Sequence, residues 1–146
     1  MPYTFKLEAL RKYHEFEEER AQKALSEAER IREAAAEKLT AHIEHRHTSE
    51  KTFARQQATL APPQAAMYRH FMQRLTKEIN ILEQKLKLAA KACDKKRQAL
   101  LKAVQRRKTL DRLKEKGEQA YMEALSRDEE KFIDEMAINR HMLKRR

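Results

Sequence analysis

Apolar side chains recur every three or four residues along most of this chain, which is the spacing of one face of an α-helix. The rhythm is clearest after residue 67. There it runs without interruption through Tyr68, Met72, Leu75, Ile79, Leu82, Leu86, Ala89 and Cys93, and it resumes with Leu100, Ala103 and Leu110. An apolar seam of this length, on a helix that is otherwise polar, predicts a coiled coil.

A second helical pattern precedes this one. Residues 3–60 contain no proline or glycine, and their apolar positions are Phe5, Leu7, Leu10, Tyr13, Ala21, Ala24, Ala28, Ile31, Ala35, Leu39, Ile43, Phe53 and Leu60. The pattern weakens between residues 44 and 52, where polar side chains dominate. We therefore expect a first helix over about 3–60, with its apolar face turned toward a partner helix.

Two adjacent prolines, Pro62 and Pro63, separate the two patterns. Proline lacks a backbone N–H and clashes with the preceding helical turn, so it does not sit inside a helix. The sequence thus predicts a turn at 61–65 and a second helix over about 66–142. The expected fold is all-α, a long two-helix antiparallel coiled-coil hairpin forming a single domain, 1–146. A straight rod would waste the facing seams, whereas pairing of two chains through an open hinge stays possible.

If the turn centres near residue 62, facing residues have numbers that sum to about 125. Phe53 then meets Met72, and Ile43 meets Leu82. Nothing in the first helix faces the chain after about Tyr121, so the hairpin should carry a C-terminal single-helix extension. This extension keeps an apolar face at Leu125, Phe132, Met136 and Leu143. An apolar face with no partner in its own chain calls for one elsewhere.

The net charge and its distribution along the chain limit the classes of partner that the chain can bind. The net charge is +10, and residues 85–116 account for the excess with 13 basic and 3 acidic side chains. Such a stripe attracts an acidic protein, a nucleic acid or an anionic lipid surface. Nucleic acid is not expected, because the stripe has no interleaved aromatic residues for base stacking. No apolar run is long enough for direct membrane insertion, and the start resembles no signal peptide, so we expect a cytoplasmic protein.

Catalytic and cofactor chemistry finds little support. The single glycine, Gly117, rules out a glycine-rich phosphate loop, and no nucleophile stands beside a base in a recognisable motif. We expect no enzyme, no catalytic residue and no cofactor. His42 and His45 lie one helical turn apart and could bind a metal, but solvated histidines explain them better, so no metal site is expected. Cys93 falls on the seam and is interpreted as a small core residue.

Aromatic and sulfur-containing side chains gather directly after the proline pair, in "MYRHFMQRL". They include Met67, Tyr68, Phe71 and Met72. They either pack the end of the hairpin against Phe53 or form an adhesive patch there, and the sequence leaves both readings open.

The sequence resembles the FliJ family, small coiled-coil proteins of the bacterial flagellar type III export apparatus. Three segments carry the resemblance: "FKLEAL" near the start, "YRHFMQRLTKEI" after the turn and "EEKFIDEMAINR" near the end. The matching positions are Phe5, Leu7 and Leu10 in the first, Tyr68, Phe71, Leu75 and Ile79 in the second, and Glu130, Asp134, Glu135, Ala137 and Arg140 in the third.

The resemblance implies a non-enzymatic hairpin similar to the central stalk of rotary ATPases. It implies three partners: the hexameric flagellar export ATPase, the export-gate membrane protein and the export chaperones. It would place the chain in the cytoplasm, held at the cell membrane by the export apparatus. The expected gate contacts are Tyr68, Phe71 and Leu75. The expected contacts with the ATPase ring are Leu125, Phe132, Asp134, Glu135, Met136 and Arg140.

Three alternatives remain at this point. The first is the equivalent stalk protein of virulence type III secretion, which physical reasoning does not separate from the flagellar one. The second is a basic coiled-coil binder of nucleic acid or anionic surfaces, acting through residues 85–116. The third is a plain spacer whose helices only set a distance.

Overall fold

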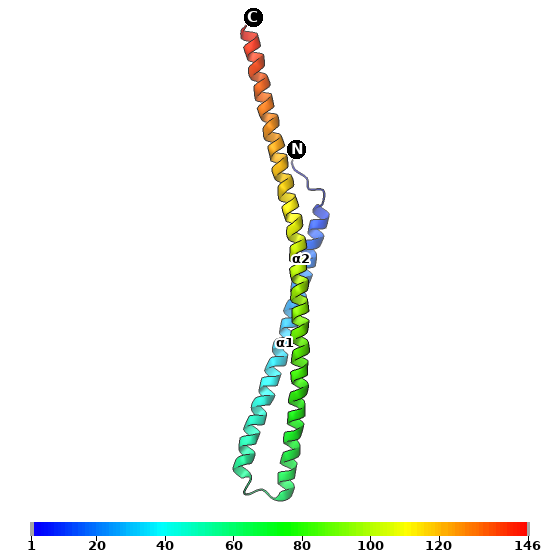
Figure 1. Cartoon of the computed structure of the whole chain (residues 1–146), viewed down its shortest axis with the longest axis vertical. Coiled ribbons are helices and arrows are strands. Elements are labelled where there is room, and N and C mark those ends of the chain that lie inside the picture. The colour runs from blue at the N-terminus through cyan, green and yellow to red at the C-terminus, as the bar shows by residue number, and fades with distance from the viewer. Residues whose placement is uncertain (1, 146) are drawn as a thin grey trace. The chain divides into compact units, whose positions relative to one another are not determined.

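The structure, a computed structural model that describes residues 2–145, consists of two long helices joined by a short loop (Figure 1). Helix α1 covers Glu8–Gln56 and helix α2 covers Pro62–Lys144, and the described residues contain no strand. The prediction of an all-α two-helix antiparallel hairpin is confirmed. The chain packs as two compact units: unit 1 is 1–18 with 102–146, and unit 2 is 19–101. The expected single domain therefore stays a prediction.

Helix α1 is shorter than predicted at both ends, beginning at Glu8 instead of residue 3 and ending at Gln56 instead of residue 60. A turn precedes it, in which the Glu8 amide donates to the Phe5 carbonyl oxygen at 3.2 Å. The acidic Glu8 side chain in the first helical turn suits the positive end of the helix dipole. Residues 2–7 therefore do not belong to α1.

The predicted turn at 61–65 lies instead at 57–61, because the two prolines belong to the next helix. Pro62 is the first residue of α2, where its missing N–H has no intrahelical partner to lose and its fixed φ fits the helix. At the other end of the loop, the carbonyl oxygen of Gln56 accepts from the amides of Thr59 and Leu60 at 2.9 and 3.1 Å. The prolines therefore start a helix and do not themselves form the reversal.

Unit 2 contains the loop and the seam of the hairpin. In Figure 1 the cyan part of α1 and the green part of α2 run side by side on either side of the loop. Cys93 is fully buried, as predicted for a small core residue, and the other buried apolar residues are Ala28, Leu75, Ile79 and Leu82. Small Ala28 on α1 allows the two backbones to approach each other here.

Near the loop, the helices meet one turn away from the predicted register. Phe53 stacks on Tyr68, with ring centroids 4.8 Å apart, and does not face Met72 as expected. The Tyr68 hydroxyl donates to the backbone oxygen of Ser49 at 3.1 Å, and Ser49 is itself buried. The shift follows from the position of the loop, which turns the chain about four residues earlier than a turn centred on the prolines would.

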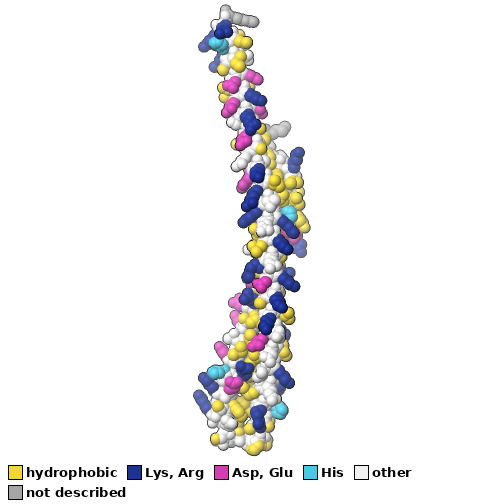
Figure 2. All heavy atoms as spheres, in the orientation of Figure 1, with side chains coloured by type: hydrophobic (Ala, Val, Ile, Leu, Met, Phe, Trp, Pro, Cys, Tyr) yellow, Lys and Arg dark blue, Asp and Glu magenta, His cyan; other side chains and the backbone are white. Residues whose placement is uncertain are grey.

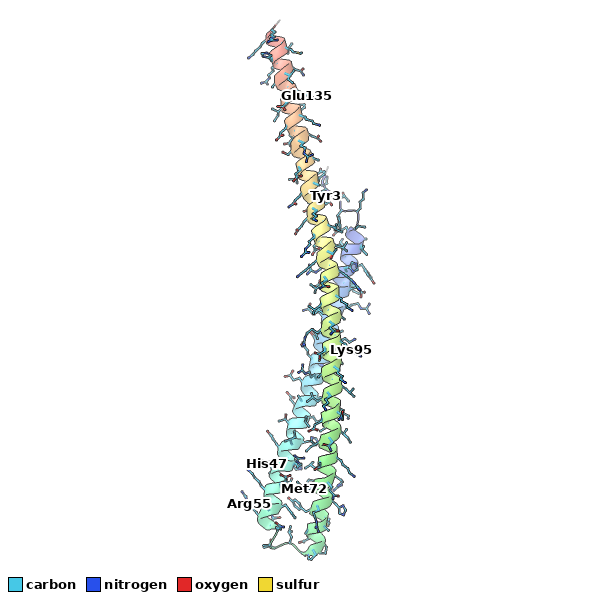
Figure 3. All side chains as sticks on the ribbon, viewed as in Figure 1. Tyr3, His47, Arg55, Met72, Lys95 and Glu135 are labelled. Atoms are coloured by element: carbon cyan, nitrogen blue, oxygen red, sulfur yellow. The ribbon has the colours of Figure 1, made fainter. Side chains whose placement is uncertain are left out.

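Unit 1 explains the only glycine of the chain. A Cβ atom added at Gly117 would overlap the Tyr3 phenol oxygen and would lie 2.8 Å from its ring carbon Cζ. The Tyr3 ring also packs near the ring of Tyr121, with centroids 5.8 Å apart. The segment before α1 therefore crosses α2 at a point where only hydrogen fits on the helix (Tyr3 is labelled in Figure 3).

Within unit 1, ion pairs join the start of α1 to α2 in addition to an apolar seam, in which Ala103 and Leu110 of α2 are buried as predicted. Lys114 lies 3.3 Å from Glu8, Arg11 lies 3.5 Å from Asp111, and Arg107 donates a hydrogen bond to Glu18. Leu7, Leu10 and Tyr13, which the apolar pattern placed on the seam, are between 42% and 54% exposed. That prediction is corrected: at this end of α1 the charged face turns toward α2.

Past Tyr121, every described residue of α2 is exposed. The predicted C-terminal single-helix extension is thus present, and α2 continues to Lys144, two residues beyond the expected end. We call Met122–Arg145 the tail.

We expect Gly117→Ala to release Tyr3 while slightly stabilising α2. Alanine is favoured over glycine inside a helix by about 1 kcal/mol, and the overlapping atoms belong to the outer end of a side chain that can rotate away. The thermal midpoint should rise or stay constant, whereas proteolysis before residue 8 should become faster. Tyr3→Ala, which empties the same contact without adding a methyl group, should show the faster proteolysis alone. A drop in the midpoint for Gly117→Ala would contradict this reading.

We expect the start of α1 to become less stable in acid, because Glu8 pairs with Arg11 on the same helix and with Lys114 on α2. The hydrogen bond from Arg11, with help from Lys114, lowers the pKa of Glu8 from 4.5 to about 2. A carboxyl whose pKa is lowered by folding stabilises the fold above its unfolded pKa and loses that contribution as the pH falls toward its folded pKa. The amide protection factors over residues 8–18, which take the pH dependence of intrinsic exchange into account, should therefore fall between about pH 4.5 and pH 2.

Glu8→Gln should show the lower protection factors already at neutral pH. Glu27→Gln is the matched control, because Glu27 pairs with Arg30 on its own helix and does not bridge to α2. Equal effects of the two variants would show that the bridge to α2 contributes nothing.

Candidate partner-binding surfaces

The tail presents a continuous apolar stripe with no covering segment among the described residues of unit 1. Leu125, Phe132, Met136 and Leu143 are 40%, 63%, 42% and 71% exposed. Steps of seven, four and seven residues place all four on one side of the helix. Shallow surface grooves run along it, one lined by Leu125, Phe132 and Ile133 and the next by Ile133, Met136 and Ala137. We call these four residues the tail stripe.

Charged residues border the tail stripe unequally. Helical periodicity puts Glu135 on one flank of the stripe and Arg140 on the other, but it puts Asp134 on the opposite side of the helix. Arg140 lines the same groove as Met136. Figure 3 labels Glu135 on the end of α2 that lies beyond α1. Of the six residues predicted to contact a ring, five can therefore meet one partner surface, whereas Asp134 points away from that surface.

A second exposed apolar surface lies in unit 1 at the start of α1. Leu7, Leu10 and Tyr13 form it, and the Tyr13 ring also packs against His14 with centroids 5.4 Å apart. Sequence reasoning missed it because it assigned these residues to the seam. The signal was present in the charges: Glu8 and Arg11 recur at helical spacing opposite Lys114 and Asp111, which carry the complementary signs.

An aromatic cluster fills the loop end of the hairpin in unit 2. Tyr68 contacts Phe53, and Phe71 meets the Tyr68 ring at 6.2 Å and the His45 ring at 5.8 Å, both edge to face. The cluster joins α1 to α2, and Figure 2 shows apolar surface gathered at that end of the hairpin. Packing within the hairpin is thus one clear role of these rings.

The three residues predicted to contact an export gate differ in what they offer to a partner. Leu75 is only 5% exposed, so it lies in the seam and has almost no surface of its own to present. Tyr68 and Phe71 are half-buried, whereas their neighbour Met67 is 73% exposed. Figure 3 labels Met72 and His47 at this end, on α2 and α1 respectively. A partner at this end would touch Met67 and the outer edges of the rings.

Two histidines of α1, His42 and His45, make separate contacts. His42 donates from Nδ1 to the Lys38 carbonyl oxygen at 2.9 Å, and its Nε2 lies 3.8 Å from Glu78. His45 packs on Phe71. Across residues 2–145, no three His, Cys, Asp or Glu side chains are grouped so that they could hold a metal ion.

The basic stretch of α2 is partly neutralised by α1. In unit 1, Arg107 and Lys114 pair with Glu18 and Glu8, and in unit 2 Arg97 lies 4.0 Å from Glu29. The other lysines and arginines between 85 and 116 are exposed, and dark blue side chains follow α2 in Figure 2. An acidic partner for this stretch stays a prediction.

A membrane span is not found in the part of the chain that the structure describes, since neither helix has a stretch long and apolar enough to cross a bilayer.

Comparison with known proteins identifies one family. Neither the curated proteins nor the solved structures yield a match to this chain. The family model of the flagellar FliJ protein matches residues 3–146, which is nearly the entire sequence. The resemblance seen in the sequence is thereby confirmed. With this family match over a two-helix hairpin, the chain belongs to the FliJ family and is a component of the flagellar protein export apparatus.

Proposed function

We propose that this protein is a stalk that couples the flagellar export ATPase to the export gate. In this proposal the tail enters the ATPase ring and the loop end of the hairpin contacts the cytoplasmic part of the gate. The protein performs no reaction itself and also assists the export chaperones, a role that rests on the family alone.

The tail stripe carries the proposal. Four large apolar side chains, exposed on one side of one helix, remain in water unless another surface covers them. Burying each of them fully is worth about 1.5–3 kcal/mol, so the stripe can support a specific contact after the ordering costs of association are met. In this proposal the interior of the ATPase ring supplies the surface that covers the tail stripe.

Charges and the second apolar surface extend the same docking face. Glu135 on one flank can meet basic groups of the ring, and Arg140 on the other can meet acidic ones. Leu7, Leu10 and Tyr13 belong to the same unit as the tail and add apolar area. The proposal therefore uses both termini of the chain, with the tail as the main contact.

At the gate, some residues of the loop end contact the partner and others support those contacts. Met67 and the exposed edge of Phe71 are the contacting groups. Tyr68, through its hydrogen bond to Ser49, and Leu75, through the seam, hold the two helices in the geometry that presents them.

A truncation ending at Ala124 should lose binding to the export ATPase and any stimulation of ATP hydrolysis. The removed residues are exposed and support no part of the hairpin, so the thermal unfolding of the remaining chain should change little. Phe132→Glu should act like the truncation. Ile138→Glu is its matched control, since it adds the same charge at an exposed position away from the tail stripe. A truncated chain that still binds and stimulates the ATPase would exclude docking through the tail.

Phe71→Ala combined with Met67→Ala should weaken the capture of the gate's cytoplasmic part at least tenfold, which corresponds to about 1.4 kcal/mol. Leu75→Ala should also weaken it, but with a lower unfolding midpoint, because a buried leucine is lost. Leu82→Ala is the control for stability alone, being buried in the same seam further from the loop. If Leu82→Ala reduces gate binding as much as the Phe71 and Met67 changes do, the loop end is not the gate contact.

A further inference from the structure

The tail stripe is complementary to itself. We propose that the tail pairs with the tail of a second copy of this chain as an antiparallel two-helix coiled coil. Competition between this pairing and entry into the ATPase ring rests on the proposed function, whereas the pairing itself does not.

The spacing of the stripe supports such pairing. With Glu129 and Asn139 included, positions 125, 129, 132, 136, 139 and 143 alternate steps of four and three residues, which is a coiled-coil seam. If two tails cross about residue 134, Leu125 of one faces Leu143 of the other, and Phe132 faces Met136. Glu129 then faces Asn139, whose side-chain amide can donate to the carboxylate. Every layer joins like with like, apolar or polar.

Other registers do not achieve this match. A slip by one heptad in one direction puts Met136 against Asn139, and a slip in the other direction puts Phe132 against Glu129. Each slip leaves a polar side chain facing an apolar one. Polar residues within a coiled-coil seam select register in this way, at some cost in stability.

Charge selects the antiparallel orientation. Residues 122–135 carry 6 acidic and 2 basic side chains, whereas residues 136–146 carry 4 basic and no acidic ones. Antiparallel pairing places the acidic half of one tail beside the basic half of the other. Parallel pairing would place like charges together along the full length and Glu129 directly against Glu129. A second copy therefore fits the tail in both apolar pattern and charge.

One feature opposes the pairing. Glu135 flanks the seam near the crossing point, so Glu135 of one copy lies beside Glu135 of the other. Like charges at such positions destabilise association modestly. The pairing is consequently expected to be weak and reversible, which suits a tail that another partner must also be able to take up.

Sedimentation equilibrium of the full chain, from micromolar to submillimolar concentration, tests the pairing. The mass should rise with concentration from the 17.4 kDa monomer toward the dimer. Glu135→Gln should tighten the dimer several-fold, and Phe132→Glu should abolish it. Ile138→Glu, with the same charge change away from the seam, should leave the dimer intact. A wild-type chain that stays monomeric throughout, or Glu135→Gln that does not tighten the dimer, would overturn the proposal.

Cysteine crosslinking tests the orientation. In the antiparallel pair, residue 133 of one copy lies beside residue 133 of the other, so Ile133→Cys should form a disulfide-linked dimer under mild oxidation. Leu125→Cys should not, because the two copies of residue 125 then lie at opposite ends of the pair. The native thiol does not interfere, since Cys93 is fully buried. A crosslink through Leu125→Cys would show parallel pairing and overturn the proposal.

Glu135→Gln also separates this proposal from docking on the ATPase. The substitution removes a charge expected to help ring binding, so it should weaken ATPase binding while it strengthens self-association. If ATPase binding is absent in every variant but the dimer responds as described, the docking proposal fails and the pairing stands. If ATPase binding responds as expected and no dimer forms, the pairing alone fails.

Discussion

A helix that packs against a single neighbour can bury only one stripe of its surface, and both helices of this chain are under that constraint. Side chains that are buried in the seam cannot contact another protein, whereas side chains outside the seam can. In unit 2 the seam takes the apolar residues of α2, with Leu75, Ile79, Leu82 and Cys93 buried, whereas Ile31 and Ile43 of α1, which were predicted to lie on the seam, are 52% and 40% exposed. Binding surfaces there must come from residues beside the seam, such as Met67 and the edge of Phe71.

Unit 1 satisfies the same constraint with both kinds of residue, since Ala103 and Leu110 of α2 are buried there and ion pairs lie beside them. Glu8, Arg11 and Glu18 meet Lys114, Asp111 and Arg107, so the apolar residues at the start of α1 remain exposed. Ion pairs that are partly exposed contribute little stability each, so the burial of Ala103 and Leu110 stabilises this end of the hairpin as well. A docking surface benefits from that arrangement, because the apolar groups are already in water and the paired charges still fix which face is presented.

The sequence predicted correctly those elements whose residue pattern allows only one arrangement. The uninterrupted spacing from Tyr68 to Cys93 allows a single buried face, and Leu75, Ile79, Leu82 and Cys93 are indeed buried. The proline pair required a helix boundary but allowed two, since proline is excluded from a helix interior and accepted in a first turn. The prediction chose the turn, and the register near the loop was displaced by one helical turn as a result. At the start of α1, apolar spacing identified a face but not its direction, and the direction was set by charges on α2 far away in sequence. The contact between Tyr3 and Gly117 could not be predicted from the sequence either. A single glycine in a helical pattern does not show which side chain packs against it.

The tail is the part of α2 that does not pack against α1. Its described residues beyond Tyr121 are all exposed, so its fold rests on helix propensity and local pairs such as Arg127 with Glu123 rather than on packing. Helices in proteins gain most of their stability from packing of an apolar face against a neighbour, so a helix without such a neighbour is expected to fray. A partner that covers the tail stripe therefore contributes twice, through the buried area and through the ordering of the helix itself. Charges then decide among the partners that could do so. Glu135 is unfavourable beside its own copy and favourable beside a basic surface, so a single carboxylate biases the tail away from self-pairing whenever a basic ring is present.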